Sequence, residues 1–594
     1  MPSQVSISLH NLLSHLWRLI GRHRQHQFLL LMVLTLISTF MEVVSIGAVL
    51  PFLSVLIDPE KVFNYPLIKD HAPLFAISSA EQLILPLTVG FIIFSLISGG
   101  IRLLLLWAST KFAFANGADL SIEIYRRTLY QPYSVHISRN SSEVVSGIIS
   151  KVNSVVFSVI LPMLALISSV VLLIAITLTL LFINVIVAIT VIFVFGGCYL
   201  IITSLSRHRL KKNGKLIAHE QTQVVRALQE GLGGIRDVLL DGTQAIYCEI
   251  YEKADRPFRK AYGNNTFIGG SPRFAMESLG MVLITCLAYV LSQQSEGISS
   301  ALPLLGALAL GAQRILPAMQ QGYSAWATIT ANQAILADTI SFLNQSLPDE
   351  HEQIVTTPIS FEKTVCLSNI RFRYNNDSPW VLDGFNLEIY RGSRIGIIGS
   401  SGSGKSTAID ILMGLLTPTE GMLLIDGNPC DGTQNRLWQK MIAHVPQSIY
   451  LTDATIEENI AFGVPRALID KNRVRFAARQ AQIADFIESR PEGYNAKVGE
   501  RGIRLSGGQR QRIGIARALY KQAKILVFDE ATSALDAETE LSVMDSIDSL
   551  DRGLTIILVA HRITTLSRCD KIVEFGYGRV ISECTYQELF SRSP

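Results

Sequence analysis

The sequence predicts a polytopic α-helical membrane domain followed by a soluble α/β domain, and two observations lead to this prediction. Only 17% of the 594 residues are charged, and uncharged apolar runs such as 155–181 occur in the first part of the chain. Such a run can cross a bilayer as a helix, which requires about 20 apolar residues. Beyond residue 358, short apolar runs such as 525–528 and 555–559 alternate with helical patterns, which is typical of an α/β fold.

The first 28 residues predict a basic amphipathic helix that lies in the membrane interface. Leu12 and Trp17 occupy apolar positions, and Arg18, Arg22 and Arg24 supply positive charge. A signal peptide is the alternative, but the apolar run that follows is far too long and lacks a small-residue cleavage site. We therefore expect an N-terminal elbow helix within 1–28.

Six membrane spans are expected in a transmembrane domain over 29–340, with a linker over 341–358 and a soluble domain over 359–594. The long loops 109–153 and 206–273 are rich in lysine and arginine, unlike the other connections. This bias predicts a multi-pass protein of the inner (plasma) membrane with both long loops and both termini in the cytoplasm. The expected spans are 29–57, 83–108, 154–181, 184–205, 274–292 and 300–320.

Composition argues against two other kinds of function. The net charge is 52 − 49 = +3, which gives no case for nucleic-acid binding, so no nucleic-acid partner is expected. The seven cysteines are scattered, without a C-x-x-C pair or a histidine at metal-ligand spacing. Reduced structural thiols are therefore expected, rather than a disulfide framework or a zinc site.

A glycine-rich stretch at 399–407 has the pattern G-x-x-x-x-G-K-[ST] between a predicted strand (395–398) and a predicted helix (408–413). In that context the glycines let backbone N–H groups converge on phosphate oxygens, and the helix dipole adds positive potential. Lys405 is expected to reach the β- and γ-phosphates of a nucleoside triphosphate, and the Ser406 hydroxyl to bind Mg²⁺. The predicted cradle comprises Gly399, Ser400, Gly402, Ser403, Gly404, Lys405, Ser406 and Thr407.

Further polar residues follow the apolar runs of the α/β domain. The strand predicted at 525–528 ends in Asp529 and Glu530; one carboxylate can hold the Mg²⁺ shell while the other orients or deprotonates the attacking water. His561 ends another apolar strand, from which an imidazole can reach the γ-phosphate. Tyr374 offers a ring that can stack on adenine. Leu-Ser-Gly-Gly-Gln at 505–509 opens a predicted helix, whose N-terminus can hold another phosphate.

The order of these motifs resembles the ATP-binding cassette (ABC) family over the whole of 359–594, and Leu-Ser-Gly-Gly-Gln is that family's signature. The resemblance implies an ATP hydrolase with ATP and Mg²⁺ as cofactors. It implies that Glu530 is the catalytic carboxylate, His561 the switch histidine and Gln447 the Q-loop residue, with Glu500 in the X-loop. The implied metal ligands are Ser406, Gln447 and Asp529, and Tyr374 forms the A-loop. The implied signature residues are Ser506, Gly507, Gly508 and Gln509.

Six spans ahead of one such domain resemble a half-size exporter of the type IV ABC fold. The resemblance implies a homodimer, because the signature of one copy caps the ATP held by the other. It also suggests that Tyr130–Tyr133 and Gly231–Asp237, in the two cytoplasmic loops, are coupling segments. For any single residue there, an ordinary helix surface is an equally good interpretation.

Charged residues inside the predicted spans are costly and by default functional. Arg102 and Arg314 lie within predicted spans and Arg273 at the entrance of the fifth, and these three arginines are the candidate substrate residues. Glu42 and Glu277 also lie within predicted spans, and snorkelling or structural Glu–Arg pairing is the alternative. Their surroundings resemble lipid-linked oligosaccharide flippases of the PglK type, which implies a diphosphate-linked glycan or polysaccharide precursor moved to the outer leaflet of the membrane. An exporter of another lipid, a drug or a peptide would share the same motifs, and a non-transport ATPase of the same superfamily is the remote alternative.

Overall fold

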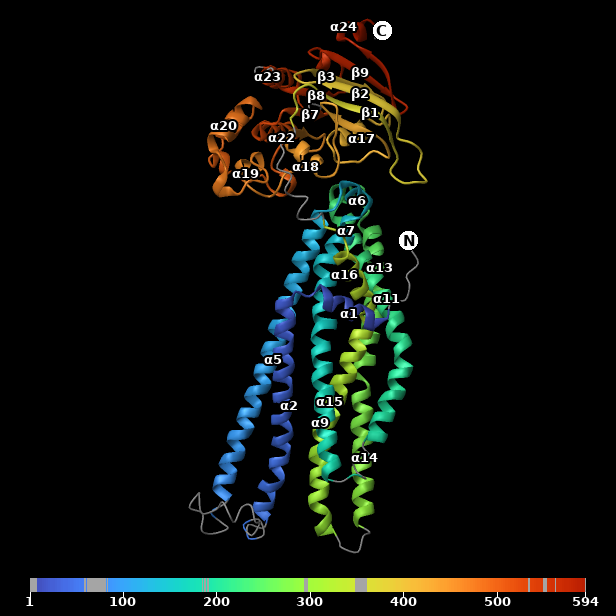
Figure 1. The fold of residues 1–594 in the computed structure, drawn as a ribbon, viewed down its shortest axis with the longest axis vertical. Coiled ribbons are helices and arrows are strands. Elements are labelled where there is room, and N and C mark those ends of the chain that lie inside the picture. The colour runs from blue at the N-terminus through green and yellow to red at the C-terminus, as the bar shows by residue number, and fades with distance from the viewer. Residues whose placement is uncertain are drawn as a thin grey trace. The chain divides into compact units, whose positions relative to one another are not determined.

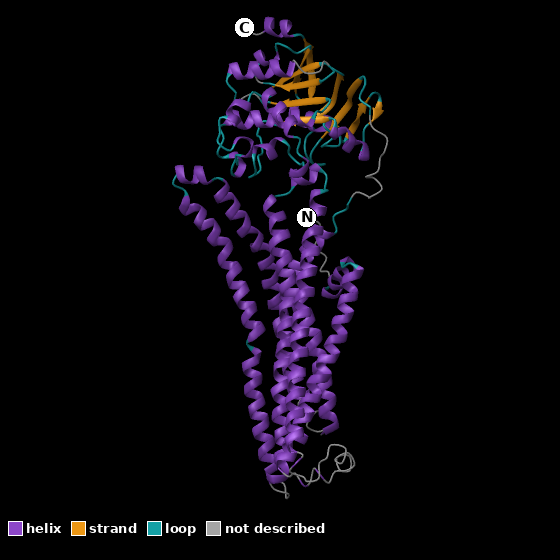
Figure 2. Cartoon of the chain, turned by 90° about the vertical axis from the view of Figure 1, so that its left-hand side faces the viewer, coloured by secondary structure: helices purple, strands orange, loops and turns teal. Residues whose placement is uncertain are grey.

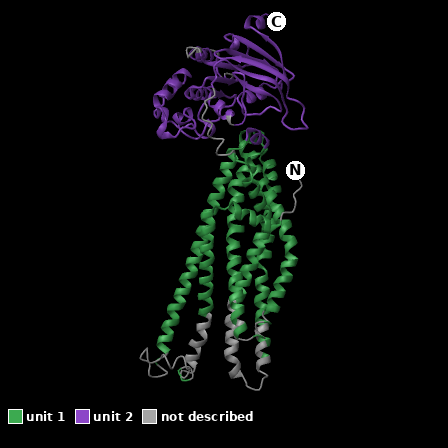
Figure 3. Cartoon of the chain, viewed as in Figure 1, with its two compact units in different colours: residues 1–131, 139–347 green, residues 132–138, 348–594 purple. Residues whose placement is uncertain are grey.

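The computed structural model describes residues 8–57, 60, 63, 82, 84–183, 185, 189, 192–292, 298–347, 360–531, 535–548, 553–560 and 562–592. The chain divides into two compact units (Figure 3). The first comprises Met1–Gln131 and Arg139–Leu347. The second comprises Pro348–Pro594 together with the short segment Pro132–Ser138, which contains helix α6 (Tyr133–Ser138).

The first unit is entirely helical in its described part, and its long helices run side by side (Figures 1 and 2). Its longest elements alternate in direction and extend well beyond the length of a simple membrane span. Its main helices are α1 (Leu9–Leu19), α2 (Arg22–Ile57), α5 (Ile84–Leu129), α7 (Ser141–Val145), α8 (Val152–Val155), α9 (Leu161–Ile183), α11 (Gly197–Gly233), α12 (Ile235–Leu240), α13 (Gln244–Gly270), α14 (Pro272–Ser292), α15 (Ile298–Ala331) and α16 (Gln333–Leu343).

The N-terminal amphipathic segment is shorter than the sequence suggested. Ser8 caps helix α1 by accepting a hydrogen bond from the Asn11 backbone N–H at 3.3 Å, and the helix ends at Leu19. Helix α2 then begins at Arg22, so the residues expected in one elbow helix belong to two helices separated at Gly21. Glycine disfavours a continuous helix, which accounts for the break at this position.

Within the described residues, three helical stretches are long and apolar enough to cross a membrane: Arg22–Ser45, Ile84–Leu129 and Ser141–Thr179. They include most of the first three predicted spans. Most of the fourth predicted span lies in the π-helical turn η5 (Ile192–Gly196) and the start of α11, and its first residues fall partly outside the described part of the chain. The fifth lies in α14 and the sixth in α15, where many side chains, those of 301–314 included, are not described.

Two π-helical turns interrupt the third long helical stretch. They are η3 (Ser146–Lys151), between α7 and α8, and η4 (Val156–Ile160), between α8 and α9. Both turns face the packed interior, because Gly147 and Lys151 in the first and Val159 and Ile160 in the second are buried. A π turn holds one more residue than an α turn and is usually found where a helix has a functional or packing constraint.

Close helix packing in the first unit depends on small residues. Helix α11 approaches α15 closely at Gly214, where a Cβ atom would lie 1.9 Å from the Ala331 carbonyl oxygen. Only glycine permits the backbones to come this close. The core nearest the amphipathic helix combines Leu12 and Leu16 of α1 with Leu336 and Ile340 of α16.

The second unit contains two sheets, whose strands are orange in Figure 2. The six-stranded sheet has the order β10-β9-β3-β8-β7-β6, and the strands from β9 to β6 are parallel. The smaller sheet is antiparallel, with the order β2-β1-β4-β5. The strands are β1 (Thr364–Phe372), β2 (Leu382–Tyr390), β3 (Arg394–Gly399), β4 (Glu420–Ile425), β5 (Asn428–Pro429), β6 (Ile442–Val445), β7 (Ile525–Asp529), β8 (Thr555–Val559), β9 (Lys571–Gly576) and β10 (Arg579–Cys584).

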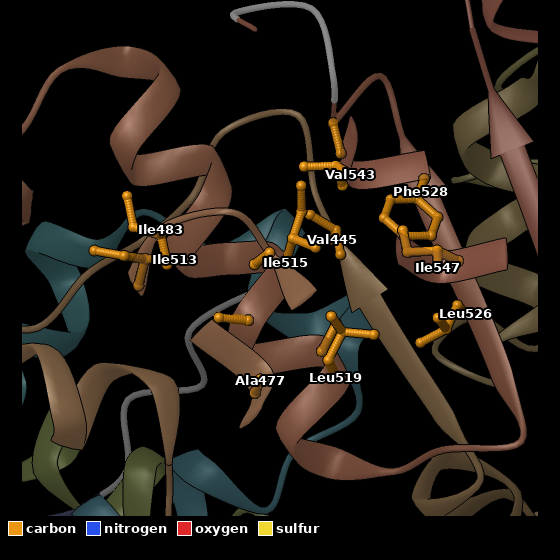
Figure 4. Close-up of a cluster of buried hydrophobic side chains, with 14 of the residues drawn as sticks. Val445, Ala477, Ile483, Ile513, Ile515, Leu519, Leu526, Phe528, Val543 and Ile547 are labelled. Carbon is orange, nitrogen blue, oxygen red and sulfur yellow. The ribbon is translucent and has the colours of Figure 1, made fainter. Parts of the chain in front are cut away.

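Helices pack against the parallel sheet through a continuous apolar core. Figure 4 shows Val445 of β6 and Phe528 of β7 close to Ile515 of α22 (Gly507–Lys521) and Val543 of α23 (Ala537–Asp548). The remaining helices are α17 (Lys405–Leu412), α18 (Gly432–Lys440), α19 (Ile456–Ile460), α20 (Lys471–Gln480), α21 (Ala484–Glu488) and α24 (Tyr586–Arg592). Burial on both faces explains why these strands read as unbroken apolar runs in the sequence.

Candidate functional site

The carboxyl ends of four adjacent parallel strands bring the predicted site residues to one edge of the sheet. Ile397 of β3 pairs with Val559 of β8, and Val559 pairs with Asp529 of β7. Val445 of β6 pairs with Phe528 of β7 in the same register. The segments that follow these strands therefore begin side by side, which is where ligands bind in open α/β sheets.

The glycine-rich loop between β3 and α17 requires glycine for steric reasons. Gly404 has a φ of +98° and directly precedes the first turn of α17. A Cβ atom at Gly404 would lie 2.9 Å from Leu382 Cδ2, and one at Gly399 would lie 2.5 Å from the Phe575 carbonyl oxygen. The loop therefore presents backbone N–H groups at a helix N-terminus, the arrangement that binds phosphate.

Lys405 is buried at the start of α17 and folds back over its own loop. Its Nζ donates hydrogen bonds to the carbonyl oxygens of Gly399 at 2.7 Å and Ser400 at 3.0 Å. The Ser403 hydroxyl in the same loop is buried without a hydrogen-bond partner among the described residues. Buried polar groups are normally paired, so an ammonium and an unpaired hydroxyl at one loop fit an anionic ligand.

Tyr374 lies beside the cradle. Its hydroxyl oxygen is 3.0 Å from Thr407 Oγ1, and its ring meets Phe372 edge-on with centroids 5.1 Å apart. The side chain remains half exposed, so a face of the ring is accessible for stacking. The structure thus brings the predicted adenine-stacking residue and the predicted phosphate loop together.

The acidic end of β7 is joined to the segment after β6. Gln447 Nε2 donates a hydrogen bond to Glu530 Oε2 at 2.6 Å, and the Glu530 backbone N–H donates to the Val559 carbonyl oxygen at 3.0 Å. Glu530 has a φ of +51°, a left-handed conformation that is strained for a non-glycine residue. Such strain is concentrated at functional sites, where the surrounding structure holds it.

The oxygen donors near the cradle suit magnesium rather than a softer metal. Ser406, Gln447 and Asp529 offer a hydroxyl, an amide oxygen and a carboxylate, and the described part of the chain has no cluster of three or more His, Cys, Asp or Glu residues. Mg²⁺ is usually held by one or two carboxylates together with substrate phosphates. The donor set therefore fits Mg²⁺ bound with a nucleotide.

The signature motif begins helix α22 with a capping box. Ser506 Oγ accepts a hydrogen bond from the Gln509 backbone N–H at 3.2 Å, and Gln509 Oε1 accepts one from the Ser506 backbone N–H at 2.9 Å. Two of the four signature residues thus stabilise the helix start locally. Gly507 and Gly508 follow in the first turn and keep its backbone open to an approaching anion.

His561, predicted after β8, lies outside the described residues. Arg314 belongs to α15, but its side chain is not described.

The other candidate substrate arginines form ion pairs with the acids predicted beside them. Arg102 Nη1 of α5 lies 3.5 Å from Glu42 Oε1 of α2, and Arg273 Nε lies 2.7 Å from Glu277 Oε1 within α14. The Arg102 side chain is 45% exposed and that of Glu42 only 13% exposed. The first pair therefore links two helices, whereas the second stays within one helix turn.

Asp410 is a site residue that the sequence interpretation missed. It lies on α17, and burial together with the neighbouring Asp529 carboxylate raises its pKa from 3.8 to about 6. The sequence signal that could have identified Asp410 is its position on the helix that begins with Lys405 of the cradle. Asp410 is therefore close enough to the predicted metal-binding acid to influence it electrostatically.

The fold and this site define a P-loop ATPase unit joined to a helical membrane unit, and comparison with known proteins specifies the family. Residues 382–533 match the ABC transporter family. An ATP-dependent lipid A-core flippase from Saccharophagus degradans is 32% identical over 80% of this chain and 80% of its own length. The chain belongs to the ABC transporter family. It is an exporter-type half-transporter that binds and hydrolyses ATP, as the sequence predicted.

Two further similarities differ in how much of the chain they cover. The structure of a bacterial Atm1-family ABC exporter with ATP bound matches 96% of both chains with a TM-score of 0.77 at 23% identity, which confirms the predicted exporter fold. The leukotoxin translocation ATP-binding protein LktB of Mannheimia glucosida is 42% identical, but over only 41% of this chain and 34% of its own length. The protein is thus a multi-pass membrane transporter.

Replacing Asp410 by Asn should stabilise the protein above about pH 6 and have little effect below pH 4. Because the pKa of Asp410 is raised in the folded state, that state keeps a proton that the unfolded state loses between pH 3.8 and about 6. Stability due to this group therefore falls as the pH rises through that window, and an amide avoids the loss. Melting temperatures in EDTA without nucleotide, from pH 4 to pH 8, would measure the difference.

The exposed Asp453 provides a matched control for the replacement of an aspartate by asparagine. A stabilisation by Asp410→Asn that increased toward acid pH would contradict the electrostatic assignment.

Proposed function

We propose that the protein uses ATP to move a lipid with an anionic, diphosphate-linked glycan head group from the inner to the outer leaflet. The observation that carries the proposal is the arginine–glutamate pair between α2 and α5. Arg314 lies in the sixth predicted span, and Arg273 lies at the entrance of the fifth. Charge at this depth is expensive unless it serves a pathway or a partner. Arginine has the bidentate geometry that suits a diphosphate.

The exposure of the arginine in the Arg102–Glu42 pair supports a role beyond structural pairing. At 3.5 Å the single contact to Glu42 occupies one nitrogen, and a guanidinium has five N–H donors. The similarity to a protein named as a lipid A-core flippase also favours a lipid with a large polar head group. A peptide substrate is less favoured, because the similarity to a leukotoxin translocation protein covers only 41% of the chain.

The assembly we propose is a homodimer in the inner membrane with both termini in the cytoplasm. One chain contributes one cradle and one signature motif, so two chains are needed for two composite sites. The lysine- and arginine-rich loops 109–153 and 206–273 favour the cytoplasmic orientation of the ATPase unit.

In the nucleotide site, we propose that Glu530 activates the attacking water and that Gln447 holds its carboxylate in position. Ser406, Gln447 and Asp529 would hold Mg²⁺, which would neutralise charge on the phosphates when bound. Lys405 and the loop N–H groups would bind the phosphates, Tyr374 would stack on adenine, and His561 would contact the γ-phosphate. The bond between Gln447 and Glu530 supports the first assignment, since it orients the acid.

Glu530→Gln should retain ATP binding and lower ATP hydrolysis roughly 10²-fold or more, because the amide cannot accept the proton of the attacking water. Lys405→Ala should instead weaken nucleotide binding itself, since it removes a phosphate contact of the ground state. Phosphate release and binding of a fluorescent ATP analogue, measured on both variants in liposomes, distinguish the two effects. Near wild-type hydrolysis by Glu530→Gln would exclude it as the catalytic carboxylate.

Mixing two inactive variants tests the composite sites. Homodimers of Ser506→Arg and of Lys405→Ala should each be inactive, because every site lacks a signature or a cradle. A heterodimer of the two has one site built from an intact cradle and an intact signature, so mixed subunits should recover part of the ATPase activity. Substantial hydrolysis by the Ser506→Arg homodimer, or no recovery on mixing, would argue against a signature that acts on the partner's ATP.

Replacing Arg102, Arg273 or Arg314 by Ala should lower flipping of a fluorescent diphosphate-linked sugar lipid at least about tenfold, the loss expected for a charged hydrogen bond. ATP hydrolysis without substrate should persist, because the nucleotide site is unchanged. Arg314→Lys should restore flipping only in part, since lysine keeps the charge without the bidentate geometry. Flipping and ATP hydrolysis are measured in the same proteoliposomes.

Arg259→Ala is the matched control, because Arg259 pairs with Asp255 at 3.1 Å on α13, outside the predicted spans. It should leave flipping unchanged. Full flipping by the alanine variants of Arg102, Arg273 and Arg314 would assign these arginines to structural pairing. Stimulation of ATP hydrolysis by plain phospholipids alone would point to another lipid substrate.

A further inference from the structure

The membrane unit has two places from which the chain continues into the ATPase unit. The chain leaves the first unit after Gln131, returns at Arg139 and leaves it again after Leu347. The first exit follows helix α5, and the last follows helix α16. Although more than 200 residues separate these exits in sequence, side chains at and just beyond the end of α5 bind directly to the backbone at and just beyond the end of α16.

Arg127, in the last turn of α5, caps the C-terminus of α16. Its Nη1 donates hydrogen bonds to the carbonyl oxygens of Leu343 at 2.6 Å and Gln345 at 2.9 Å. Its Nε donates to Glu123 Oε1 at 2.7 Å, which fixes the guanidinium on α5. The last carbonyls of a helix lack partners within the helix, and a cation there also suits the helix dipole. The contact is therefore a strong one between two separate elements.

The residues on either side of the α6 segment, Gln131 and Arg139, also contact α16 or the residues that follow it. Gln131 Nε2 donates to the Ser346 carbonyl oxygen at 2.9 Å and to the Arg127 carbonyl oxygen at 2.9 Å. On the return, the Arg139 guanidinium lies 5.9 Å from the centre of the Phe342 ring, within range of a cation–π contact. Both flanks of α6 are thus held at residues 342–346.

Helix α16 is in turn fixed to the body of the membrane unit. Lys151 of η3 is buried and forms an ion pair with Asp338 at 2.7 Å, and His15 Nε2 of α1 is 2.8 Å from Asn344 Oδ1. The Gln345 side chain is buried with neither amide atom paired among the described residues. A buried amide of this kind is able to take a new partner when its neighbours shift, so the junction is firmly attached yet not fully satisfied.

We propose that Arg127 and Gln131 form a clamp that makes the ends of α5 and α16 move as one piece, so that both connections to the ATPase unit shift together during the ATP cycle. The clamp is a positioning device outside the nucleotide site. Without it, movement at the nucleotide site would reach the membrane unit through two independent connections, and part of the free energy of hydrolysis would be lost.

The test compares Arg127→Ala and Gln131→Glu with wild type in proteoliposomes. Glutamate has the size of glutamine, but its carboxylate cannot donate hydrogen bonds and would repel the carbonyl oxygens of Arg127 and Ser346. Hydrogen–deuterium exchange with and without ATP and vanadate reads the coupling without any transported substrate. In wild type, the amides of 127–131 and 341–346 should respond to nucleotide together; in both variants, the response of 341–346 should be lost while 127–131 still responds.

Basal ATP hydrolysis should persist in both variants, and the number of lipids flipped per ATP should fall about threefold or more, the range reported for residues that carry coupling. Arg226→Ala is the matched control, because Arg226 forms the same 2.7 Å pair with a glutamate one turn away, Glu230, within α11. Arg127→Lys should restore the exchange response in part.

The proposal would be overturned if 341–346 responded to nucleotide in both variants as in wild type, or if the two segments responded separately in wild type. The exchange readout needs no substrate, so failure of the substrate assignment would leave it unaffected. Loss of the response in Arg226→Ala as well would reduce the effect to general helix destabilisation and would also overturn it.

Discussion

The parallel pairing of β3, β8, β7 and β6 is the constraint on which the ATPase unit depends. Ile397 pairs with Val559, Val559 with Asp529, and Val445 with Phe528, so the segments that follow these strands start at the same edge. The strand ends alone therefore place the cradle, the Asp529–Glu530 pair and Gln447 close together, without long connecting loops. A shift of one residue in any of these pairings would point each side chain of the strand to the opposite face of the sheet and displace the segment that follows it.

Local chemistry was readable from the sequence where a short segment carries both the geometry and the function. The cradle is an example, because a Cβ atom at Gly399 or Gly404 would clash with neighbouring atoms, so both positions require glycine. The capping box at Ser506 and Gln509 is also sequential. By contrast, the high pKa of Asp410 results from burial beside Asp529, which is 119 positions away, and no local pattern reveals such an encounter.

In the membrane unit too, some features could be predicted from the sequence and others could not. Apolar run length predicted its helices, and the pairing of Glu42 with Arg102 and of Glu277 with Arg273 agrees with the expectation that these acids neutralise two of the arginines. The boundary of the N-terminal helix was less accurate, since amphipathic spacing continues past the break at Gly21. The role of Arg127 was not visible at all, because its partners are backbone carbonyls of a distant segment.

The π turns of the third long helix have an evolutionary consequence. Each holds an additional residue without rotating the helix beyond it, whereas an insertion into a regular α-helix would turn all later side chains by about 100°. Relatives that lack one residue within 146–151 or 156–160 can therefore close the turn into an α turn and still bury the same faces. A gap inside a membrane helix, which normally signals a misalignment, would here be compatible with an unchanged fold.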